Sequence, residues 1–498
     1  MPDNAWKKIK QHPLETLEEL FAKEPDRLSH LTREVAGLYL DWSKTHLDRE
    51  LLDAFVQLAT ESGFEAARDS MFAGDIVNVT EGRSADHVAE RGTGQAASVE
   101  LASLRRGRTR ALVDAMEASA FGDVTGILHI GIGGSVLGPA LLVDSLGRSA
   151  LRLQVSFLSN IDPQAFESAI RPLDPATTFI VTVSKSFTTA ETAANLAAAV
   201  EWLGREGVED PYGRVIAVTA SPDAARDAGI DESRILQFSE GVGGRYSLWS
   251  AVSISAALAL GWDSFEELLE GAAMMDRHFR YTGLEENAPL LAAFSDLLYS
   301  QKLACSSRAL FPYDERLGLL VPYLQQLEME SNGKSVRTDG KPVGRPTAPV
   351  VWGGVGTDAQ HAMFQLLHQG TSRIPVEFVA VAEDETALPG HHRQLLLNAF
   401  AQGAALMRGR KSDEPHKSYQ GDRPSSTILL DRLDARRLGA LIAFYEHRTF
   451  CEAVLLGINP FDQFGVELGK DIARELGEDG EQGSLDPSTR ALIDKAGL

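Results

Sequence analysis

The densest group of reactive side chains is a run of hydroxyls around one lysine. It follows Thr178–Val183, an apolar run of the kind that forms a buried strand. Thr188 and Glu191 have the spacing of a capping box, so we expect a helix to begin here. Hydroxyls and an ammonium group at a helix N-terminus bind anions, and capping alone explains only Thr188. The run therefore predicts a phosphate site, whose candidate residues are Ser184, Lys185, Ser186 and Thr189.

A second candidate phosphate seat is a glycine-rich turn after the apolar run Ile127–Ile130. Gly131, Gly133 and Gly134 allow the backbone to adopt positive φ and to approach a ligand closely. The helix expected to follow directs free N–H groups at the turn, and Ser135 adds a hydroxyl. A tight strand-to-helix turn without a ligand is the alternative.

A nucleotide is a poorer match to this turn than phosphate alone. The Rossmann spacing requires glycine where Val136 stands. The Walker spacing requires Gly-Lys at the positions of Gly138 and Pro139. We therefore expect phosphate without a nucleotide.

Arg245 lies in Gly243–Ser250, which we expect to open a long apolar helix that ends at Leu260. A cation at the positive end of a helix dipole is disfavoured unless an anion faces it. A salt bridge and a contact with a ligand or a transition state both satisfy that condition.

Two glutamates, Glu328 and Glu330, are candidates for general acid–base chemistry. Two residues apart on a helix, they point about 200° away from each other and cannot form a carboxylate pair. We expect one to face a cleft and the other to be solvated. Ser331–Gly333 is typical of a helix end, where functional side chains gather.

His361 follows a glycine turn after an expected strand, where a proton-transfer role and a structural role are both open. His368 is seven residues away, which is not the i, i+4 spacing of a helical zinc site. We expect no metal site. From the residues around it alone, Lys470 is expected to be an ordinary surface lysine.

Composition narrows the class of protein. The 498 residues carry a formal net charge of −22, which disfavours binding to nucleic acid or to anionic membranes. Cys305 and Cys451 are the only cysteines, which favours reduced thiols in a cytosolic protein over a disulfide framework. The first 20 residues lack a signal-peptide pattern, and no apolar run is long enough to span a bilayer. We expect a cytoplasmic protein.

The elements that position these residues alternate between strand and helix, which is typical of doubly wound, mostly parallel α/β sheets. Eight strands are expected, at Ile127–Ile130, Leu153–Leu158, Thr178–Val183, Arg214–Val218, Arg308–Phe311, Pro349–Trp352, Pro375–Val381 and Thr427–Leu430. We predict four parts: an N-terminal helical arm (1–120), two α/β domains (121–265 and 280–445) and a C-terminal helical segment (446–498). The acidic run Glu475–Glu481 is expected to be solvated.

Taken together, the stretches resemble the phosphoglucose isomerase family, which is built from two sugar-isomerase domains. The resemblance is carried by Gly131–Pro139, Ser184–Thr192, Gly243–Ser250, Met329–Lys334 with Gly356–Gly370, and Gly457–Lys470. Ser186 stands where several members have threonine, and it keeps the hydroxyl.

The resemblance implies an aldose–ketose isomerase that interconverts glucose 6-phosphate and fructose 6-phosphate through an enediol(ate), without metal or redox cofactor. Glu330 would be the base and Arg245 would stabilise the enediolate. His361, supported by Glu191, would assist ring opening, and Lys470 would act near the ring oxygen. The resemblance further implies a homodimer with a shared active site, and a sugar site lined by Gly134, Ser135, Gln326 and Gln463.

Three other functions share parts of this pattern. A sugar-phosphate-sensing regulator needs the phosphate loops but has no use for Glu330, His361 and Lys470 together. An amidotransferase with sugar-isomerase domains needs an N-terminal catalytic cysteine, and this chain begins Met-Pro-Asp. An NAD enzyme needs the third glycine of the Rossmann turn.

Overall fold

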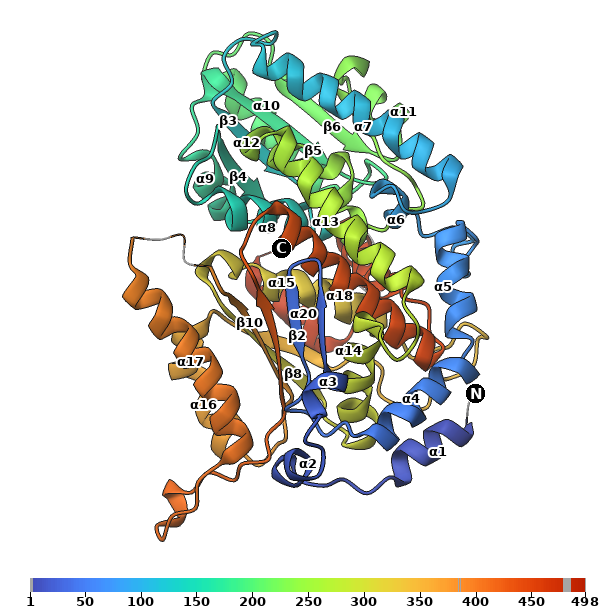
Figure 1. Ribbon diagram of the computed structural model, residues 1–498. Helices are drawn as coiled ribbons and strands as arrows, with labels where there is room; N and C mark the ends of the chain where they lie inside the picture. Colours follow the sequence, from blue (N-terminus) through green and yellow to red (C-terminus); the bar gives the residue numbers. More distant parts are fainter. Residues whose placement is uncertain (1–2, 384, 386, 478–484, 498) are drawn as a thin grey trace. The chain divides into compact units, whose positions relative to one another are not determined.

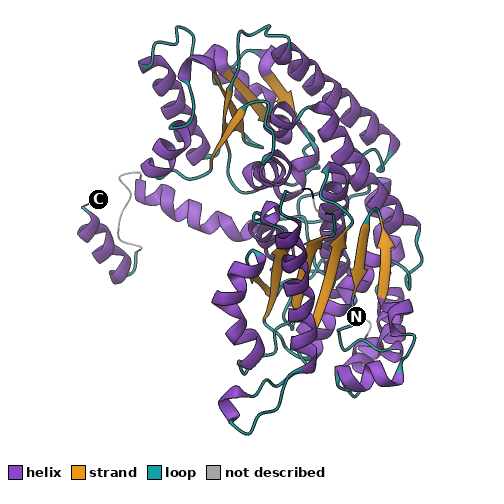
Figure 2. Cartoon of the chain, turned by 60° about the vertical axis from the view of Figure 1, so that its left-hand side comes forward, coloured by secondary structure: helices purple, strands orange, loops and turns teal. Residues whose placement is uncertain are grey.

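The computed structural model describes residues 3–383, 385, 387–477 and 485–497. The chain forms two compact units, Met1–Phe461 and Asp462–Leu498. The larger unit holds two sheets with helices on both faces of each, as Figure 2 shows. In the described ranges, no helix has the length and apolar character of a membrane span.

The first sheet is wholly parallel, in the order β4-β3-β5-β6-β7. Its strands are β3 (Gly126–Ile130), β4 (Gln154–Leu158), β5 (Thr178–Val183), β6 (Val215–Thr219) and β7 (Ile235–Gln237). The helices of this part are α8 (Gly134–Gly147), α9 (Pro163–Ile170), α10 (Ala190–Arg205), α11 (Pro222–Asp227) and α12 (Ile254–Leu260). Four of the five strands were predicted; β7 has three residues, too few to show a periodic pattern.

The second sheet has the order β1-β2-β11-β10-β8-β9, and its four strands from the predicted second domain are parallel. Its strands are β1 (Thr32–Val35), β2 (Leu38–Asp41), β8 (Ser307–Tyr313), β9 (Val350–Gly353), β10 (Val376–Val381) and β11 (Ser425–Leu430). The expected α/β class with mostly parallel sheets is therefore confirmed.

The prediction that residues 1–120 are a purely helical arm is wrong, because β1 and β2 form a hairpin that pairs antiparallel with β11. Ala36 and Gly37 both have positive φ, 54° and 80°, as a two-residue hairpin turn requires. Leu38 and Leu40 are buried on either side of the exposed Tyr39. That period of two extends over only four residues, which is too short to distinguish a strand from a helix in the sequence.

The described residues up to Glu117 also form seven helices: α1 (Asp3–Gln11), α2 (Leu17–Lys23), α3 (Arg27–Leu31), α4 (Arg49–Glu61), α5 (Phe64–Ala73), α6 (His87–Glu90) and α7 (Ala96–Glu117). The remaining helices of the larger unit are α13 (Trp262–Tyr281), α14 (Ala288–Leu297), α15 (Leu320–Leu324), α16 (Gly356–Gln369), α17 (Pro389–Arg408) and α18 (Ala435–Leu456). Figure 1 shows α18 alongside α13 and α14, with which it packs.

Successive side chains of a strand point to opposite faces of its sheet, and both faces are buried. In β10, Val379 and Val381 face the large core that contains α18, whereas Phe378 and Ala380 face a smaller core with α16 and α17. In β3, Ile127 joins the same large core. One continuous core therefore supports one face of each sheet.

The smaller unit is helical, as predicted, with α19 (Glu467–Gly477) and α20 (Pro487–Ala496). The run Glu475–Glu481 falls largely outside the described residues. The domain boundaries 1–120, 121–265, 280–445 and 446–498 stay predictions.

Candidate active site

The two predicted phosphate loops leave neighbouring strands of the first sheet. β3 lies between β4 and β5, so the chain after β3 and the chain after β5 diverge to opposite sides. Such a switch point opens a crevice at the carboxyl edge of the strands, where ligands bind. The order of the sheet therefore places the Gly131–Ser135 turn beside the Ser184–Thr189 turn.

The glycine turn is in close contact with the two segments that carry the candidate reactive groups. Gly133 has φ +57°, and a Cβ there would lie 2.7 Å from Nε2 of Gln326. A Cβ on Gly134 would lie 2.1 Å from the carbonyl carbon of Gly244. No larger residue fits at either position, so glycine here allows the turn, with Ser135, to approach Arg245 and Gln326.

Lys185 is fixed in place by backbone carbonyls. Its Nζ donates to the carbonyl oxygens of Glu240 at 2.7 Å and Val242 at 3.1 Å. Burial lowers the pKa of Lys185, and the nearby Arg83 lowers it further. The ammonium group of Lys185 thus lies beside the segment that leads to Arg245. A bound anion would stabilise its charged form.

The hydroxyls around Lys185 form a local network. The Ser184 hydroxyl accepts from the Phe187 amide at 3.1 Å and lies 3.2 Å from Oγ1 of Thr189. Ser186 and Thr188 are linked at 2.7 Å. The predicted capping box of Thr188 and Glu191 is wrong: α10 begins one residue later, and its N-cap is Thr189.

Thr189 makes no side-chain cap hydrogen bond to its own helix. Its hydroxyl is directed instead to the Ser184 network. The helix start predicted for this stretch is confirmed to within about one residue. The hydroxyls of the turn are therefore gathered at a helix N-terminus, an arrangement suited to phosphate.

Arg245 is buried, with its guanidinium held at three points. Nε donates to the Ser331 hydroxyl at 2.6 Å, and Nη2 donates to the Pro460 carbonyl at 2.5 Å. Nη1 lies 3.5 Å from Oε1 of Glu330. The sequence left two roles open for Arg245, a salt bridge and a contact with a ligand. In the structure Arg245 forms an ion pair with Glu330, the predicted base.

The long helix predicted from Gly243 to Leu260 is wrong. The segment is broken into two 3-10 helices, η4 (Gly244–Trp249) and η5 (Ala251–Ser253), followed by α12. Ser250 is extended at φ −105° and ψ −169°: its amide donates to the Ser247 carbonyl at the end of η4, and its hydroxyl accepts from the Val252 amide at the start of η5. The apolar run reflects burial and not one continuous helix.

Glu330 ends a π-helix, η8 (Gln325–Glu330), a rare form found at functional sites. Its side chain is 20% exposed and Gln326 is half-buried on the same element. Glu328 is buried and paired with Arg308 and Arg448, so the expectation that the second glutamate is solvated is wrong. The spacing of Glu328 and Glu330 correctly predicted that the two carboxylates point apart, but it did not predict that Glu328 is buried.

The remaining predicted site residues lie on α16, on α10 and in the smaller unit. His361 is exposed on α16, and neither His361 nor Glu191 makes a hydrogen bond or ion pair within the described ranges. Gln463 and Lys470 belong to the smaller unit, where Lys470 is half-exposed and 3.1 Å from Glu467. Their roles stay predictions.

Sequence reasoning missed the residues that support Arg245. The Tyr246 hydroxyl lies 2.9 Å from that of Ser331, and Pro460 follows the buried Asn459. Asn459 Nδ2 donates to Oδ1 of Asn78 at 2.9 Å. These contacts join segments that are 85 to 381 residues apart, and the sequence shows only a helix end at Ser331–Gly333 and a turn signal before Pro460.

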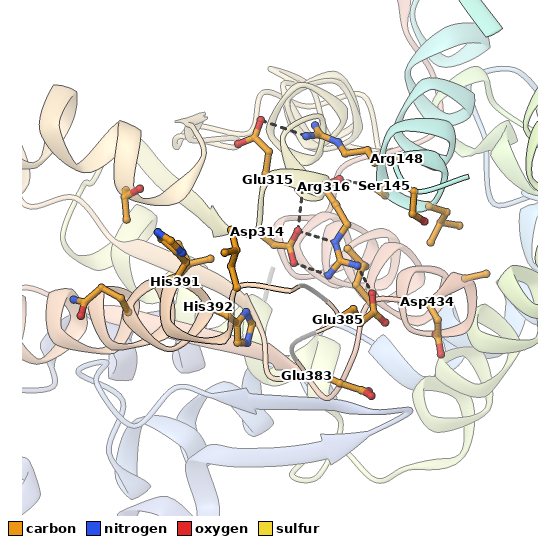
Figure 3. Close-up of a pocket in the computed structure, with 18 of the residues that line it drawn as sticks. Ser145, Arg148, Asp314, Glu315, Arg316, Glu383, Glu385, His391, His392 and Asp434 are labelled. Atoms are coloured by element: carbon orange, nitrogen blue, oxygen red, sulfur yellow. Dashed lines mark hydrogen bonds and ion pairs between the residues drawn. The ribbon is translucent and has the colours of Figure 1, made fainter. Parts of the chain in front are cut away.

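A hollow of about 940 Å³ in the larger unit contains none of the predicted site residues. It lies where the end of α8 meets the turn at Asp314–Arg316 and the start of α17 (Figure 3). Arg316 pairs there with Asp314 at 2.8 Å and with Glu385 at 2.6 Å. Carboxylates outnumber arginines in its lining, so it is poorly suited to an anionic ligand.

Within the part of the chain that the structure describes, no cluster of three or more His, Cys, Asp or Glu side chains could hold a metal ion. Cys305 and Cys451 are both buried, free thiols.

The chain matches the model of the family described as phosphoglucose isomerase over residues 41–493. It is 60% identical to a glucose-6-phosphate isomerase of Rhizorhabdus wittichii, over 99% of this chain and 98% of that protein. It is 54% identical to one of Zymomonas mobilis, covering 99% and 97%. The crystal structure of a glucose-6-phosphate isomerase from Chlamydia trachomatis superposes with TM-score 0.90 at 31% identity, covering 100% and 98%. These similarities confirm the resemblance seen in the motifs: the chain belongs to the phosphoglucose isomerase family.

Proposed function

We propose that this member of the family interconverts glucose 6-phosphate and fructose 6-phosphate through an enediol(ate), as a step of glycolysis and gluconeogenesis. Relatives that are 54–60% identical over almost the whole chain bear the name glucose-6-phosphate isomerase. The observation that carries the mechanism is the 3.5 Å approach of the Arg245 guanidinium to the Glu330 carboxylate.

Glu330 acts as the base in this proposal. It takes the proton from C2 of the open-chain aldose and returns it to C1, while a proton passes from the C2 hydroxyl to the C1 oxygen. The carbonyl thereby moves from C1 to C2 and no group is lost. Arg245 lies close enough to stabilise the negative charge that develops on the enediolate oxygens.

The phosphate is bound at the paired loops of the first sheet. Lys185 supplies the positive charge, and the hydroxyls and helix N-termini supply hydrogen bonds. A local basic site is needed because the whole chain has a net charge of −22, which repels an anionic substrate at long range. The proposed phosphate-binding residues are Ser184, Lys185, Ser186 and Thr189.

The sugar lies between the glycine turn and η8, in contact with Gly134, Ser135 and Gln326. Their mutual proximity supports this assignment. In this proposal Lys470 acts near the ring oxygen and Gln463 contacts the sugar.

His361 assists ring opening from a second copy of the chain, with Glu191 supporting it. The exposed position of His361, without a hydrogen bond or ion pair in the described part of its own chain, supports a role across a homodimer interface. A two-fold axis would make this exchange reciprocal.

The proposed enzyme needs no cofactor, since a base and an electrostatic partner suffice for proton transfer next to a carbonyl. We propose a cytoplasmic location, which the two buried free thiols support. We further propose that the protein does not bind nucleic acid or a membrane surface, which its net charge of −22 supports.

The direct test supplies fructose 6-phosphate and follows glucose 6-phosphate with a dehydrogenase specific for it. We expect turnover of the order of 10² s⁻¹ or more, unchanged after exhaustive dialysis against EDTA. Free fructose should be a very poor substrate because the phosphate provides binding energy. Absence of turnover would refute the activity, and loss restored by zinc or manganese would refute the metal-free chemistry.

A further inference from the structure

Glu328, two residues before the proposed base, is bound by two buried arginines. Arg308 Nη2 donates to Oε2 of Glu328, and Arg448 Nη2 donates to Oε1 at 2.7 Å. Arg308 comes from β8 and Arg448 from α18. The π-helix that carries Glu330 is thus attached at Glu328 to both the second sheet and the central helix of the fold.

A second glutamate, Glu377 of β10, lies on the other side of the same arginines. Arg308 Nη1 donates to its Oε1 at 3.1 Å, and Arg448 Nη1 donates to its Oε2 at 2.8 Å. Tyr445 adds a hydrogen bond at 2.9 Å. Each arginine therefore bridges both glutamates, and all four charged side chains are at most 7% exposed.

The turn after Glu330 is attached to α18 as well. Asn332 Nδ2 donates to the Thr449 carbonyl at 3.1 Å and to Oε2 of Glu452 at 2.9 Å. Ser331 accepts from Arg245. Glu330 is consequently held between one attachment two residues before it and another two residues after it.

Burial of this many charges is costly, and stability alone does not require it. Replacing a buried ion pair with well-packed apolar residues is often neutral or stabilising, whereas removal of one partner is strongly destabilising. Burial would raise the pKa of Glu328, but Arg308 and Arg448 lower it below the usual value, so the charge is retained. What the ion pairs provide, and apolar packing does not, is a defined orientation of η8.

We propose that Glu328 is a positioning residue: Arg308 and Arg448 hold it so that η8 presents the Glu330 carboxylate opposite Arg245. The proposal rests on the role of Glu330 in the proposed function. A displacement of about 1 Å at a reacting group can cost roughly 100-fold in rate, so this attachment affects catalysis without touching substrate.

The matched test compares Glu328→Gln with Glu377→Gln. Both changes remove one buried carboxylate from the same two arginines and leave Asp296, 3.4 Å from Arg448, in place. Only Glu328 is on η8. We expect both variants to lose thermal stability to a similar extent, but only Glu328→Gln to lose about 10- to 100-fold in kcat, with KM for fructose 6-phosphate within about twofold of the parent.

Equal kcat values in the two variants, assayed well below both melting temperatures, would overturn the proposal. If Glu328→Gln does not fold, Glu328→Asp replaces it, because it keeps the charge and shortens the attachment by one methylene. Its kcat should then fall about tenfold at nearly parental Tm, and an unchanged kcat would overturn the proposal.

Glu330→Gln, measured in the same assay, separates this inference from the proposed function. An active Glu330→Gln enzyme would show that Glu330 is not the base, and the positioning proposal would fail with it. An inactive Glu330→Gln enzyme together with equal kcat for Glu328→Gln and Glu377→Gln would reject the positioning role alone.

Discussion

The guanidinium of Arg245 and the carboxylate of Glu330 face each other at 3.5 Å, across 85 residues of sequence. Arg245 is 1% exposed and Glu330 is 20% exposed. The arginine is therefore fixed in the protein interior, while the carboxylate is open on one side. That asymmetry suits a fixed electrostatic partner and a base that must reach a substrate carbon.

Glu330→Gln keeps the size of the side chain and removes its basicity. We expect kcat to fall by at least about 10³-fold with little change in KM, because the amide cannot accept the substrate proton. Steady-state kinetics in both directions measure this. Glu267→Gln, an exposed glutamate on α13, is the control and should behave like the parent. A kcat loss of less than about tenfold would contradict the assignment of the base.

Arg245→Lys retains one positive charge but loses the planar fork. A single ammonium cannot reproduce the contacts to Ser331, Pro460 and Glu330 at once. We expect kcat to fall about 100-fold, as when a preorganised donor to a developing oxyanion is lost. The control is Arg148→Lys, at a half-exposed arginine paired with Asp144, which should leave kcat unchanged. Parental kcat in Arg245→Lys would argue against enediolate stabilisation by Arg245.

Of the eleven strands in the described ranges, eight were predicted from the sequence, because parallel strands buried on both faces appear as apolar runs. The two turns that we propose for phosphate binding were also visible, because glycine or hydroxyl groups follow such runs. It failed where neighbours distant in sequence decide the outcome. The sequence did not show that Glu328 is buried, since its partners Arg308 and Arg448 are 20 and 120 residues away. The approach of Arg245 to Glu330 likewise follows from the contact of η4 with η8, which no local pattern encodes.

The affinity for substrate should fall at alkaline pH because Lys185 loses its proton. Its pKa in the folded protein is lowered by burial and by Arg83, so the ammonium loses its proton at a pH below that of an ordinary lysine. Phosphate binding favours the protonated form. KM for fructose 6-phosphate should therefore be lowest near neutral pH and rise as the pH increases toward 10.5, the value of an unperturbed lysine.

Lys185→Arg provides the control for this pH effect, since arginine stays charged throughout the range. Its KM is expected to be higher than that of the parent at pH 7 but nearly constant with pH. The measurement is KM from pH 7 to pH 10 at fixed ionic strength, for both enzymes. Parallel profiles in the two would mean that another group causes the change.

The last prediction concerns the shared active site. In the proposed homodimer, each site combines Glu330 of one chain with His361 of the partner subunit. Glu330→Gln and His361→Ala should each be severely impaired as pure proteins. In a mixed dimer, one site then holds both lesions and the other holds neither. Random pairing makes half of the dimers mixed, each with one intact site of two, so co-refolding should restore about a quarter of parental activity.

The alternative arrangement gives a different result. If His361 acted within its own chain, every site of a mixed dimer would carry one lesion, and activity would not return. Native mass spectrometry must show that mixed dimers form, so that a failure to pair is not read as a failure to complement. Co-refolding of Glu330→Gln with Lys470→Ala is a useful comparison, because the proposal assigns no cross-chain role to Lys470. Inactive mixtures of Glu330→Gln and His361→Ala, with mixed dimers present, would reject the shared site while leaving the role of Glu330 intact.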